Sequence, residues 1–545
     1  MDRNYEAAQQ ARAAEITALK DTVQNLTAEV ADLTARNAEL QRKLERMNEL
    51  LRNAQQARFG QSSEKRTYVL PDSDQLCIFN EAESLQSEKA PEPTPKTLVN
   101  SHKRKPKRTI DEMAADLPVK KVVLDLSEEE KICAACGNQL RPIGQKFVRR
   151  ELQIIPRQVY VVEYYSRTYA CKHCESETGF ASISSAPAPP ALLKHSLASP
   201  ETVAAIMAQK YIYGLPLARQ EELWKAEGYE LSRATMANWI VQCAQKYLSS
   251  VYRLIRNRLL SCHVIHADET EVQVHREKGK KNSTTSYMWV YASGRFSNTP
   301  IRYFEYQPGR SGDYPQKLLK NFKGCLITDG YSGYNKVHGV VRCACWAHMR
   351  RKWREAMPAG ATLETSKAAV GYEYCNKIFV LEQDPEMQTD DLSRRVCIRR
   401  EKSAVVLAEY WAFVEGLNPA AGSKLMDAVV YARNHKDELS AFLNYGDVDI
   451  SNNLAENAIR PFVVGRKNWL FCDTPEGADA SAIIYTLVET AKANDLDPSV
   501  YLAYLLDRIR YLGKVPAPDD LTLFLPWNPD LKDLLNSHSE VQAPA

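Results

Sequence analysis

The 545-residue sequence lacks several features that would each assign a protein to a special class. No apolar run approaches the length of about 18 residues that a membrane-spanning helix needs. The first 15 residues, MDRNYEAAQQARAAE, contain no apolar signal-peptide stretch. The chain also lacks a strong charge excess, because 71 Lys and Arg against 68 Asp and Glu leave a net charge of +3. Any nucleic-acid surface must therefore come from local clusters of cations.

The rest of the composition is that of an ordinary globular protein. Hydrophobic residues make up 44% and charged residues 26%, which excludes wholesale disorder. The length predicts three or four domains. The cysteines number 13, and without an export signal they fit a reducing cytoplasm with metal-bound or free thiols better than a disulfide framework. We therefore expect a multidomain cytoplasmic protein with no membrane segment.

A heptad repeat dominates the N-terminal segment. β-branched residues stand at the early first positions and mostly Leu at the fourth, which favours a parallel two-stranded coiled coil. The first positions are Ile16, Val23, Val30, Asn37, Leu44 and Leu51, and the fourth positions are Leu19, Leu26, Leu33, Leu40 and Met47. Asn37 should fix the register, since its amide is satisfied only opposite another Asn. We predict a leucine zipper over residues 1–58 and a homodimer or higher oligomer; the alternative is a single amphipathic helix packed on the rest of the chain.

Residues 59–125 have the composition of a flexible linker. Pro, Glu and Ser are frequent over residues 71–100, and no hydrophobic period is present there. A basic run, HKRKPKR, follows at residues 102–108. It either contacts DNA phosphates without sequence preference or is a solvated part of the linker, and the residues alone leave both interpretations open.

Two CxxC motifs then follow, at Cys133 and Cys136 and at Cys171 and Cys174. A two-residue gap lets both thiolates of a motif reach one ion, and two such motifs complete a tetrahedral Zn²⁺ site. The intervening residues 147–148 and 159–165 are rich in β-branched and aromatic side chains, which predicts strands. We therefore predict a zinc ribbon over residues 126–190 that holds structural Zn²⁺. Redox chemistry is the alternative, but it needs only one CxxC motif.

A helical pattern begins after the Pro-rich segment at residues 186–190. One helix is predicted over 218–227 with Gly228 as its end, and Ser232 should cap a second helix that runs through residue 242. Two short helices around such a turn form a candidate helix-turn-helix within residues 191–258. Arg233 and Asn238, near the start of the second helix, are then candidates for contacts with base edges or phosphates. Any helical hairpin gives the same pattern, so the residues alone do not decide whether this one binds DNA.

The segment from residue 262 to residue 350 changes to strands. Strands are predicted over 262–270, 287–291, 301–306 and 324–331, with the end of a helix at 318–322. Three strands, a helix and a further strand are the opening order of a ribonuclease-H-like fold. The first strand carries Asp268 near its end, and the last carries Asp329. Acids from neighbouring strands are what two-metal phosphoryl transfer needs, although Asp also ends strands for turn reasons.

Longer motifs carry a resemblance to a known family. They are HADET, ITDGYSGYN, CWAHMRRKW, NNLAENAIRP and GRKNWLF. In these strings, and in the order of the zipper, the zinc motifs and the helical pair, nearly the whole chain resembles the TnpC transposases of the insertion sequence sixty-six family. The resemblance implies a DDE transposase whose catalytic acids are Asp268, Asp329 and Glu456, with Mg²⁺ or Mn²⁺ held by all three.

The resemblance also implies the partners and the place of action. The partners are double-stranded DNA, both the terminal inverted repeats of the element and the target, and accessory proteins of the same element. The chain should then act in a bacterial cytoplasm in association with the nucleoid. A DNA-binding regulator without catalysis and a ribonuclease-H-fold nuclease or resolvase are the alternatives. Joining of a labelled end to a second DNA separates the transposase from both.

The spacing of the acids predicts the remaining architecture. Glu456 follows Asp329 by 127 positions, too far for one helix, and residues 364–445 are helical in pattern. We therefore expect a multidomain α/β protein with a ribonuclease-H-like core in two parts, 259–350 and 447–480. A helical insertion at 351–446 should separate them, and a helical region at 481–545 should end the chain.

The second acid is followed by Cys345 and His348, which resemble a C-x-x-H element of several transposase families with such insertions. Core packing beside the site is the interpretation preferred for Cys345. A second zinc site of Cys343, Cys345 and His348 is the alternative, although no fourth ligand is evident.

The residues around Glu456 suggest how metal and DNA are held together. Asn453, Glu456 and Arg460 are spaced to share one helical face, so we expect Asn453 to support the acid. Arg460, Arg466 and Lys467 are candidates to hold phosphates of the transposon end. Asp449 and Glu438 are rival third acids, but Asp449 lies in a predicted turn and is expected to serve the helix N-terminus instead.

Overall fold

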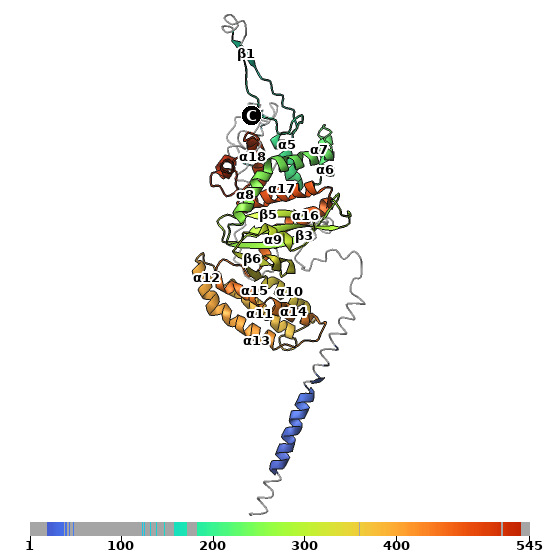
Figure 1. Ribbon diagram of the computed structural model, residues 1–545, viewed down its shortest axis with the longest axis vertical. Helices are drawn as coiled ribbons and strands as arrows, with labels where there is room; N and C mark the ends of the chain where they lie inside the picture. The colour runs from blue at the N-terminus through green and yellow to red at the C-terminus, as the bar shows by residue number, and fades with distance from the viewer. Residues whose placement is uncertain are drawn as a thin grey trace, which may run out of the picture. The chain divides into compact units, whose positions relative to one another are not determined.

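The computed structural model describes residues 19–37, 39–40, 43, 47, 123, 125, 131, 138, 147, 157–171, 182–358, 360–513 and 516–535 (Figure 1). The chain divides into two units, residues 1–52 with 158–545 and residues 53–157. Most of the predicted linker lies outside the described residues, as do Cys133, Cys136 and Cys174.

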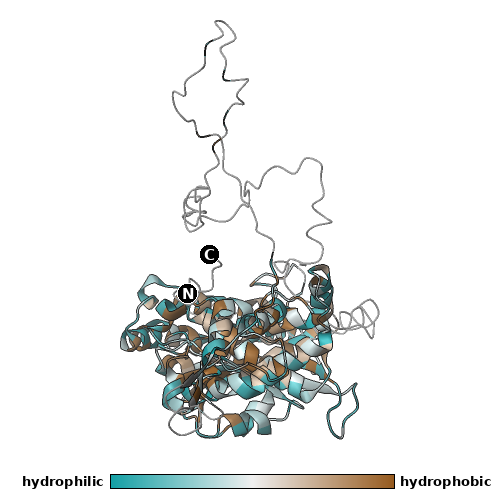
Figure 2. Ribbon diagram, turned by 90° about the horizontal axis from the view of Figure 1, so that it is seen from above, coloured by the Kyte–Doolittle hydropathy of each residue, from teal (hydrophilic) through white to brown (hydrophobic). Residues whose placement is uncertain are grey.

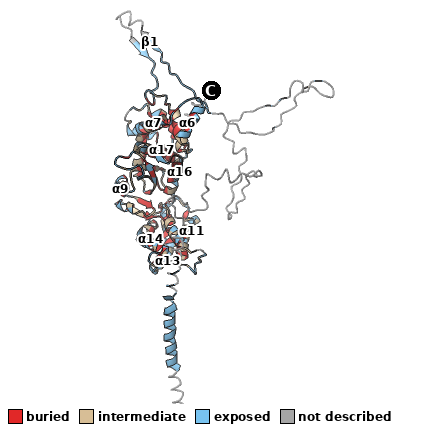
Figure 3. Cartoon of the chain, turned by 90° about the vertical axis from the view of Figure 1, so that its right-hand side faces the viewer, coloured by how far each residue is buried: buried red, intermediate tan, exposed pale blue. Residues whose placement is uncertain are grey.

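The N-terminal segment is helical over residues 19–37, as the heptad pattern predicts. Its apolar stripe is bare: Leu19, Val23, Leu26, Val30 and Leu33 are each 54–62% exposed. Figure 3 shows this helix as exposed along its length. A row of exposed Leu and Val at heptad spacing is available to a second helix.

A short hairpin stands where the zinc ribbon was predicted. Strand β1 (Thr168–Cys171) pairs antiparallel with β2 (Ser182–Ser185). The strand predicted over 159–165 is wrong, because residues 157–167 belong to no strand, and Phe147 also lies outside one. Tyr160 and Tyr165 are among the most exposed aromatic residues of the described chain. Strand propensity is effective only where side chains pack on a neighbouring strand, and among the described residues no strand pairs with residues 157–167.

Between β2 and the large sheet lie four α-helices and a π-helical turn: α5 (Pro200–Tyr211), α6 (Leu217–Ala226), α7 (Arg233–Cys243), η1 (Ala244–Leu248) and α8 (Ser249–Leu259). The predicted helical pair is confirmed as α6 and α7. Gly228 has the positive φ of +89° that a left-handed turn requires, and the Ser232 hydroxyl caps α7 by accepting the amide N–H of Thr235 at 3.1 Å.

The large sheet has the strand order β5-β4-β3-β6-β7. Its strands are β3 (Val264–Val274), β4 (Thr285–Ser293), β5 (Arg302–Gln307), β6 (Cys325–Thr328) and β7 (Val341–Ala344), with α9 (Asp313–Leu318) and η2 (Ser332–Lys336) between them. Strands β3, β4 and β5 form an antiparallel meander, whereas β6 and β7 run parallel to β3. The predicted strands are found with shifted ends. Strand β3 is longer than predicted, so Asp268 lies in its middle, and the predicted helix end at 318–322 is α9, which already ends at Leu318.

A helical region follows β7. It comprises α10 (Trp346–Ala356), α11 (Lys367–Glu382), η3 (Pro385–Met387), α12 (Leu392–Ile398), η4 (Arg399–Ser403), α13 (Ala404–Glu415), α14 (Lys424–Asn434), α15 (Lys436–Ser440) and η5 (Ala441–Asn444). These helices enclose their own apolar core around Trp346, Trp353 and Tyr410. Buried Arg399 ties them together, since its guanidinium meets Glu382 at 2.7 and 2.8 Å. The helical character predicted for residues 364–445 agrees with this region.

The chain returns to the sheet through α16 (Asn453–Trp469) and β8 (Phe471–Cys472), which pairs with the end of β3. Then follow α17 (Pro475–Ala493), α18 (Pro498–Ile509) and α19 (Pro518–Thr522). Helix α17 is buried over most of its length and packs on β5 and α18. In Figure 1 the sheet lies between α5, α8, α17 and α18 on one side and the helices after β7 on the other, and Figure 2 shows apolar segments through this interior. The expected mixed α/β class is confirmed. No helix of the described residues is long and apolar enough to span a membrane.

Candidate active site

The middle of β3 and the end of β6 bring the first two acids together. Strands β3 and β6 run parallel with His266 beside Ile327, and both chains advance two residues from that pair to reach Asp268 and Asp329. The strand pairing ends there, because β6 stops at Thr328, so the edge of β3 beside Asp268 is open. Parallel strands that diverge at their carboxyl ends leave room for a ligand between them.

The third acid comes from α16. Glu456 lies in the first turn of this helix, which packs on β3. Burial raises the pKa of Asp268 well above its usual range, and the carboxylates of Glu269, Asp329 and Glu456 raise it further. Asp329 and Glu456 therefore both lie within electrostatic reach of Asp268, although 188 positions separate Asp268 from Glu456.

The chain supplies these three carboxylates with little compensation. Asp268 accepts the amide N–H of Glu269, and Asp329 accepts that of Tyr331, each at 2.9 Å. Glu456 Oε1 is buried without a hydrogen-bond partner among the described residues. Within that part of the chain no Lys or Arg forms an ion pair with any of the three. A cluster of hard oxygen ligands with an unused, buried oxygen fits a divalent cation such as Mg²⁺.

Glu269, the fourth carboxylate, is engaged elsewhere. Arg310 meets its Oε1 through Nε at 2.8 Å and Nη2 at 2.7 Å, while the Tyr334 hydroxyl donates to Oε2 at 2.7 Å. Successive strand residues point to opposite faces, so Glu269 turns away from the side of β3 that Asp268 occupies. Its charge is neutralised by the protein, which distinguishes it from Asp268.

Asp329 is also held from the helical region. The Tyr431 hydroxyl of α14 donates to the main-chain carbonyl of Asp329 at 2.8 Å. Gly330 follows with a φ of +94°, and a Cβ at this position would lie 2.8 Å from the Tyr431 hydroxyl. Glycine is required there for both its conformation and its lack of a side chain.

Cys345 and His348 lie beside Glu456. One ligand atom from each of these three residues falls within a group 4.8 Å across, and His348 Nδ1 is 3.7 Å from Glu456 Oε1. Burial raises the pKa of the Cys345 thiol to about 11 and lowers the pKa of His348. The Cys345 sulfur accepts the amide N–H of Asn452 at 3.1 Å, which agrees with the packing interpretation. Glu456, not Cys343, completes this group, so the second zinc site is not the arrangement that the structure gathers.

Sequence reasoning missed Asn452 and selected its neighbour. Asn453 is exposed at the start of α16, whereas Asn452 is fully buried. The Asn452 amide nitrogen donates to the carbonyl of Ala267, the residue before Asp268, at 2.9 Å. Two adjacent amides look alike in a sequence, and only the start of α16 at Asn453 separates their environments.

The rival third acids have other partners. Asp449 was predicted to interact with the N-terminus of α16, and this prediction is wrong. Its carboxylate lies 3.5 Å from buried His266 and 3.7 Å from Arg295 instead. Glu438 lies 3.0 Å from His435. Both acids are accounted for by cationic or neutral partners within the fold.

Comparison with known families decides the relationship. The family model described as "Transposase IS66 family" matches residues 195–480, which is more than half of the chain and includes all three acids. The chain belongs to the IS66 transposase family. Further matches are "zinc-finger binding domain of transposase IS66" at 130–175, "IS66 C-terminal element" at 486–527 and "Transposase C of IS166 homeodomain" at 46–122. The last covers the end of the predicted zipper and most of the predicted linker, and the zinc-finger match contains all four cysteines.

Two relatives of this IS66-family chain come from Sinorhizobium fredii. The uncharacterized protein y4qI is 28% identical over 517 residues, which is 92% of each chain. The uncharacterized protein y4hP is 29% identical over 424 residues, covering 72% of this chain and 74% of the relative.

The predicted DNA-binding residues of the transposase differ in exposure. Arg460 and Lys467 are exposed on α16, and Arg233 and Asn238 are exposed on α7. Arg466 is only 9% exposed and donates to the Thr270 hydroxyl of β3 at 3.4 Å. Exposed cations are available to phosphates, whereas the position of Arg466 favours packing on the sheet.

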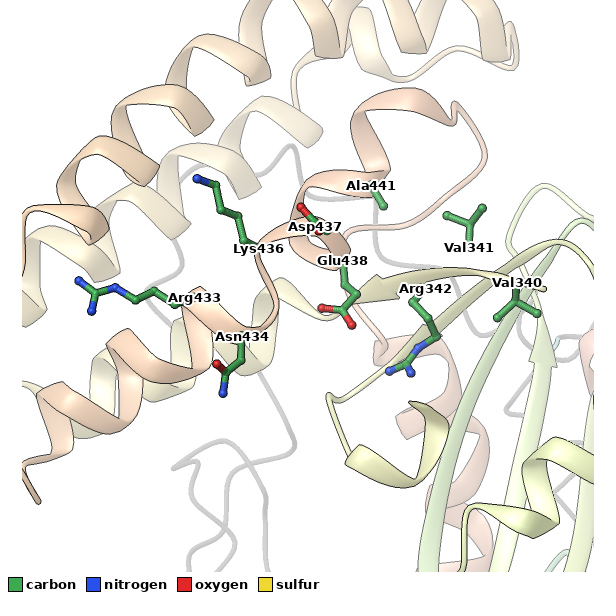
Figure 4. Close-up of a pocket in the computed structure, with 9 residues that line it drawn as sticks. All are labelled: Val340, Val341, Arg342, Arg433, Asn434, Lys436, Asp437, Glu438 and Ala441. Atoms are coloured by element: carbon green, nitrogen blue, oxygen red, sulfur yellow. The ribbon is translucent and has the colours of Figure 1, made fainter. Parts of the chain in front are cut away.

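A pocket of about 420 Å³ lies between β7 and helices α14 and α15 (Figure 4). Figure 4 shows Arg342 and Glu438 facing each other across it. Three of its charged side chains have partners: Glu438 pairs with His435, Arg433 donates to main-chain carbonyls, and Arg342 donates to Asn335 and Thr328. We assign no ligand to this pocket of the transposase.

Proposed function

We propose that this IS66-family chain is a DDE transposase that cleaves the ends of its element and joins them to target DNA. The convergence of Asp268, Asp329 and Glu456 without a balancing cation carries the proposal. The strand order β5-β4-β3-β6-β7, with a three-stranded meander followed by two parallel strands, supports a ribonuclease-H-like core. The family match supports a DNA-processing enzyme.

The three carboxylates would hold Mg²⁺ or Mn²⁺. Bound divalent cations supply activation of a water or a 3′-hydroxyl and neutralisation of charge on the phosphate. The contribution of the chain is positioning: rigid β3 and β6 fix two carboxylates, and α16 brings the third. Arg460 and Lys467 are placed on the exposed side of α16, where they would hold phosphates of the element end.

The zinc ribbon is proposed from Cys133, Cys136, Cys171 and Cys174 as four thiolate ligands of structural Zn²⁺. The zinc-finger family match over 130–175 supports it. Metal analysis should find one zinc per chain. Cys133→Ser should lose both the zinc and the protease resistance of this segment. A metal-free wild-type chain that resists protease in this segment would contradict it.

A second proposal concerns assembly. The exposed Leu and Val stripe of residues 19–37 supports the leucine zipper and therefore a homodimer or larger assembly. A wild-type zipper peptide that sedimented as a monomer at high micromolar concentration would contradict this.

The exposed start of α7 supports DNA contact by the α6–α7 pair. Together with the zipper and the ribbon, this pair would bind the element ends in the nucleoid of a bacterial cytoplasm. The domain limits 1–58, 59–125, 126–190, 191–258, 259–350, 351–446, 447–480 and 481–545 are part of this proposal.

The test is an end-joining assay. Terminal inverted repeats taken from the DNA flanking the reading frame are labelled and incubated with the full chain, Mg²⁺ and a second DNA. A transposase transfers the label to the second DNA. Cleavage without joining would instead indicate a nuclease or resolvase, and binding without either reaction would indicate a regulator.

A further inference from the structure

Asn452 precedes α16 and is completely buried. An Asn at a helix N-terminus ordinarily accepts an amide N–H of the first turn with its side chain, a contact worth about 1 kcal/mol. The Asn452 side chain makes no such bond. Its Oδ1 is buried without a partner among the described residues, so the amide is used for a contact other than capping, at a cost in stability.

The side chain reaches the first acid. Its Nδ2 donates to the Ala267 carbonyl at 2.9 Å. A carbonyl oxygen only accepts, so the orientation of the amide follows from this contact. That carbonyl belongs to the peptide group whose nitrogen is that of Asp268, and Asn452 therefore fixes the backbone from which the first carboxylate projects.

The backbone of Asn452 reaches the other two acids. Its N–H donates to the Cys345 sulfur at 3.1 Å, and the Cys345 N–H in turn donates to the carbonyl of Thr328 at 3.1 Å. The Thr328 carbonyl lies in the peptide group that leads into Asp329. The Asn452 carbonyl accepts the N–H of Glu456 at 3.1 Å. One buried residue is thus connected to the main chain beside each of the three acids.

We propose that Asn452 is a positioning residue that sets the distances among Asp268, Asp329 and Glu456, with Cys345 as its relay to the second acid. This inference rests on the proposed function only in naming the three acids as metal ligands. Asn452 acts through the backbones of the acids. Residues that orient metal ligands typically change metal affinity or activity by about 10- to 100-fold when they are replaced.

The test compares the same substitution at two neighbouring positions in the full chain. Asn452→Leu keeps the size of the side chain and removes the unpartnered oxygen together with the donor, so relief at Oδ1 offsets part of the cost of leaving the Ala267 carbonyl unpaired and the chain should stay folded. Asn453→Leu makes the same change at an exposed site and is the matched control. Asn452→Ala is the second variant, for the case that Leu does not fit. Mn²⁺ binding is measured by calorimetry without DNA, and end binding and end joining are measured separately.

We expect both Asn452 variants to bind Mn²⁺ at least about tenfold more weakly than the wild type and to join ends at least about tenfold more slowly, with unchanged binding of the element end. Asn453→Leu should match the wild type in all three measurements. Wild-type Mn²⁺ affinity in folded Asn452 variants would overturn the inference. So would a fold lost in both Asn452 variants but not in Asn453→Leu, since Asn452 would then only stabilise the chain. If the wild type joins no DNA, the proposed function fails, while the contrast in Mn²⁺ affinity still decides the role of Asn452.

Discussion

The acid cluster on the sheet and the buried acid of the helical region are surrounded in opposite ways. Glu382 is matched by Arg399 through two contacts and by Arg395 at 3.4 Å, and both guanidinium groups are almost fully covered. Asp268 and Asp329 accept main-chain N–H groups instead, and Glu456 lies beside Cys345 and His348. A carboxylate that the protein neutralises itself is structural, whereas a cluster left negative is available to a cation from solution.

This contrast predicts that neutralising a carboxylate costs activity in the acid cluster and stability in the helical region. The largest expected effect is the loss of activity. Asp268→Asn, Asp329→Asn and Glu456→Gln should each slow cleavage and joining by at least about a thousandfold, equivalent to about 4 kcal/mol. Metal-free stability should be unchanged or raised, because mutual repulsion is relieved. The double variants should be little worse than the single ones, since the site acts as a unit. Joining assays and thermal melting in a chelator measure both effects.

Asp449→Asn is the control for the assignment of the third acid. It removes a carboxylate near His266 and Arg295 and should leave the chemistry largely intact. Loss of joining in Asp449→Asn with activity retained in Glu456→Gln would show that the third acid is misassigned.

Neutralising Glu382 should instead cost stability. Glu382→Gln leaves two covered guanidinium groups without their anion, which typically destabilises by about 3–5 kcal/mol. Denaturant unfolding of the full chain should show an early transition for the helical region. A variant as stable as the wild type would remove the distinction between the two regions.

Glu305 on β5 is an intermediate case, a buried carboxylate with neither a matched cation nor a cluster. Burial raises its pKa to about 7, against a reference of 4.5, and its Oε2 is buried without a partner in the described chain. The protonated form is therefore favoured by the fold. This stabilisation is fully present below about pH 4.5 and is lost as the pH rises through about 7, by up to about 3 kcal/mol. Glu305→Gln should gain stability relative to the wild type as the pH rises from about 4.5 to about 7, and parallel profiles of the two chains over that range would contradict the assignment.

The smallest expected effect is that of the cation on folding. A ligand that binds only the folded chain at ten times its dissociation constant stabilises by about 1.4 kcal/mol. Mg²⁺ or Mn²⁺ should raise the melting temperature of the wild type and of Glu382→Gln, but not that of Glu456→Gln. An equal rise in all three chains would place the binding elsewhere.

The sequence predicts the strand pair that carries the first two acids because Asp268 and Asp329 each follow a short apolar run, although β3 continues past Asp268 to Val274. Glu456 is different, since 127 residues separate it from Asp329 and no local pattern links them. Only the family resemblance suggested it before the structure showed α16 packed on β3.

The failures have a common physical cause, which is that the deciding partner is distant in sequence. Asp449 was expected to serve its own helix, but its partner His266 comes from β3. Asn452 was missed because its importance depends on Ala267, 185 positions earlier. The strand predicted over 159–165 had suitable side chains, but in the described part of the chain no strand pairs with it.

The hydroxyl of Tyr431 on the Asp329 carbonyl has a consequence for how such enzymes diversify. A segment joined to a core only by its two ends can be shortened, replaced or exchanged between relatives without harm to the core. Here Tyr431 of α14 donates to the main-chain carbonyl of Asp329, and Gly330 leaves space for Tyr431 and His435 beside that carbonyl. The helices between β7 and α16 therefore share a contact with the end of β6: a chimera that takes these helices from another family would need a hydroxyl at the same place to keep this hydrogen bond.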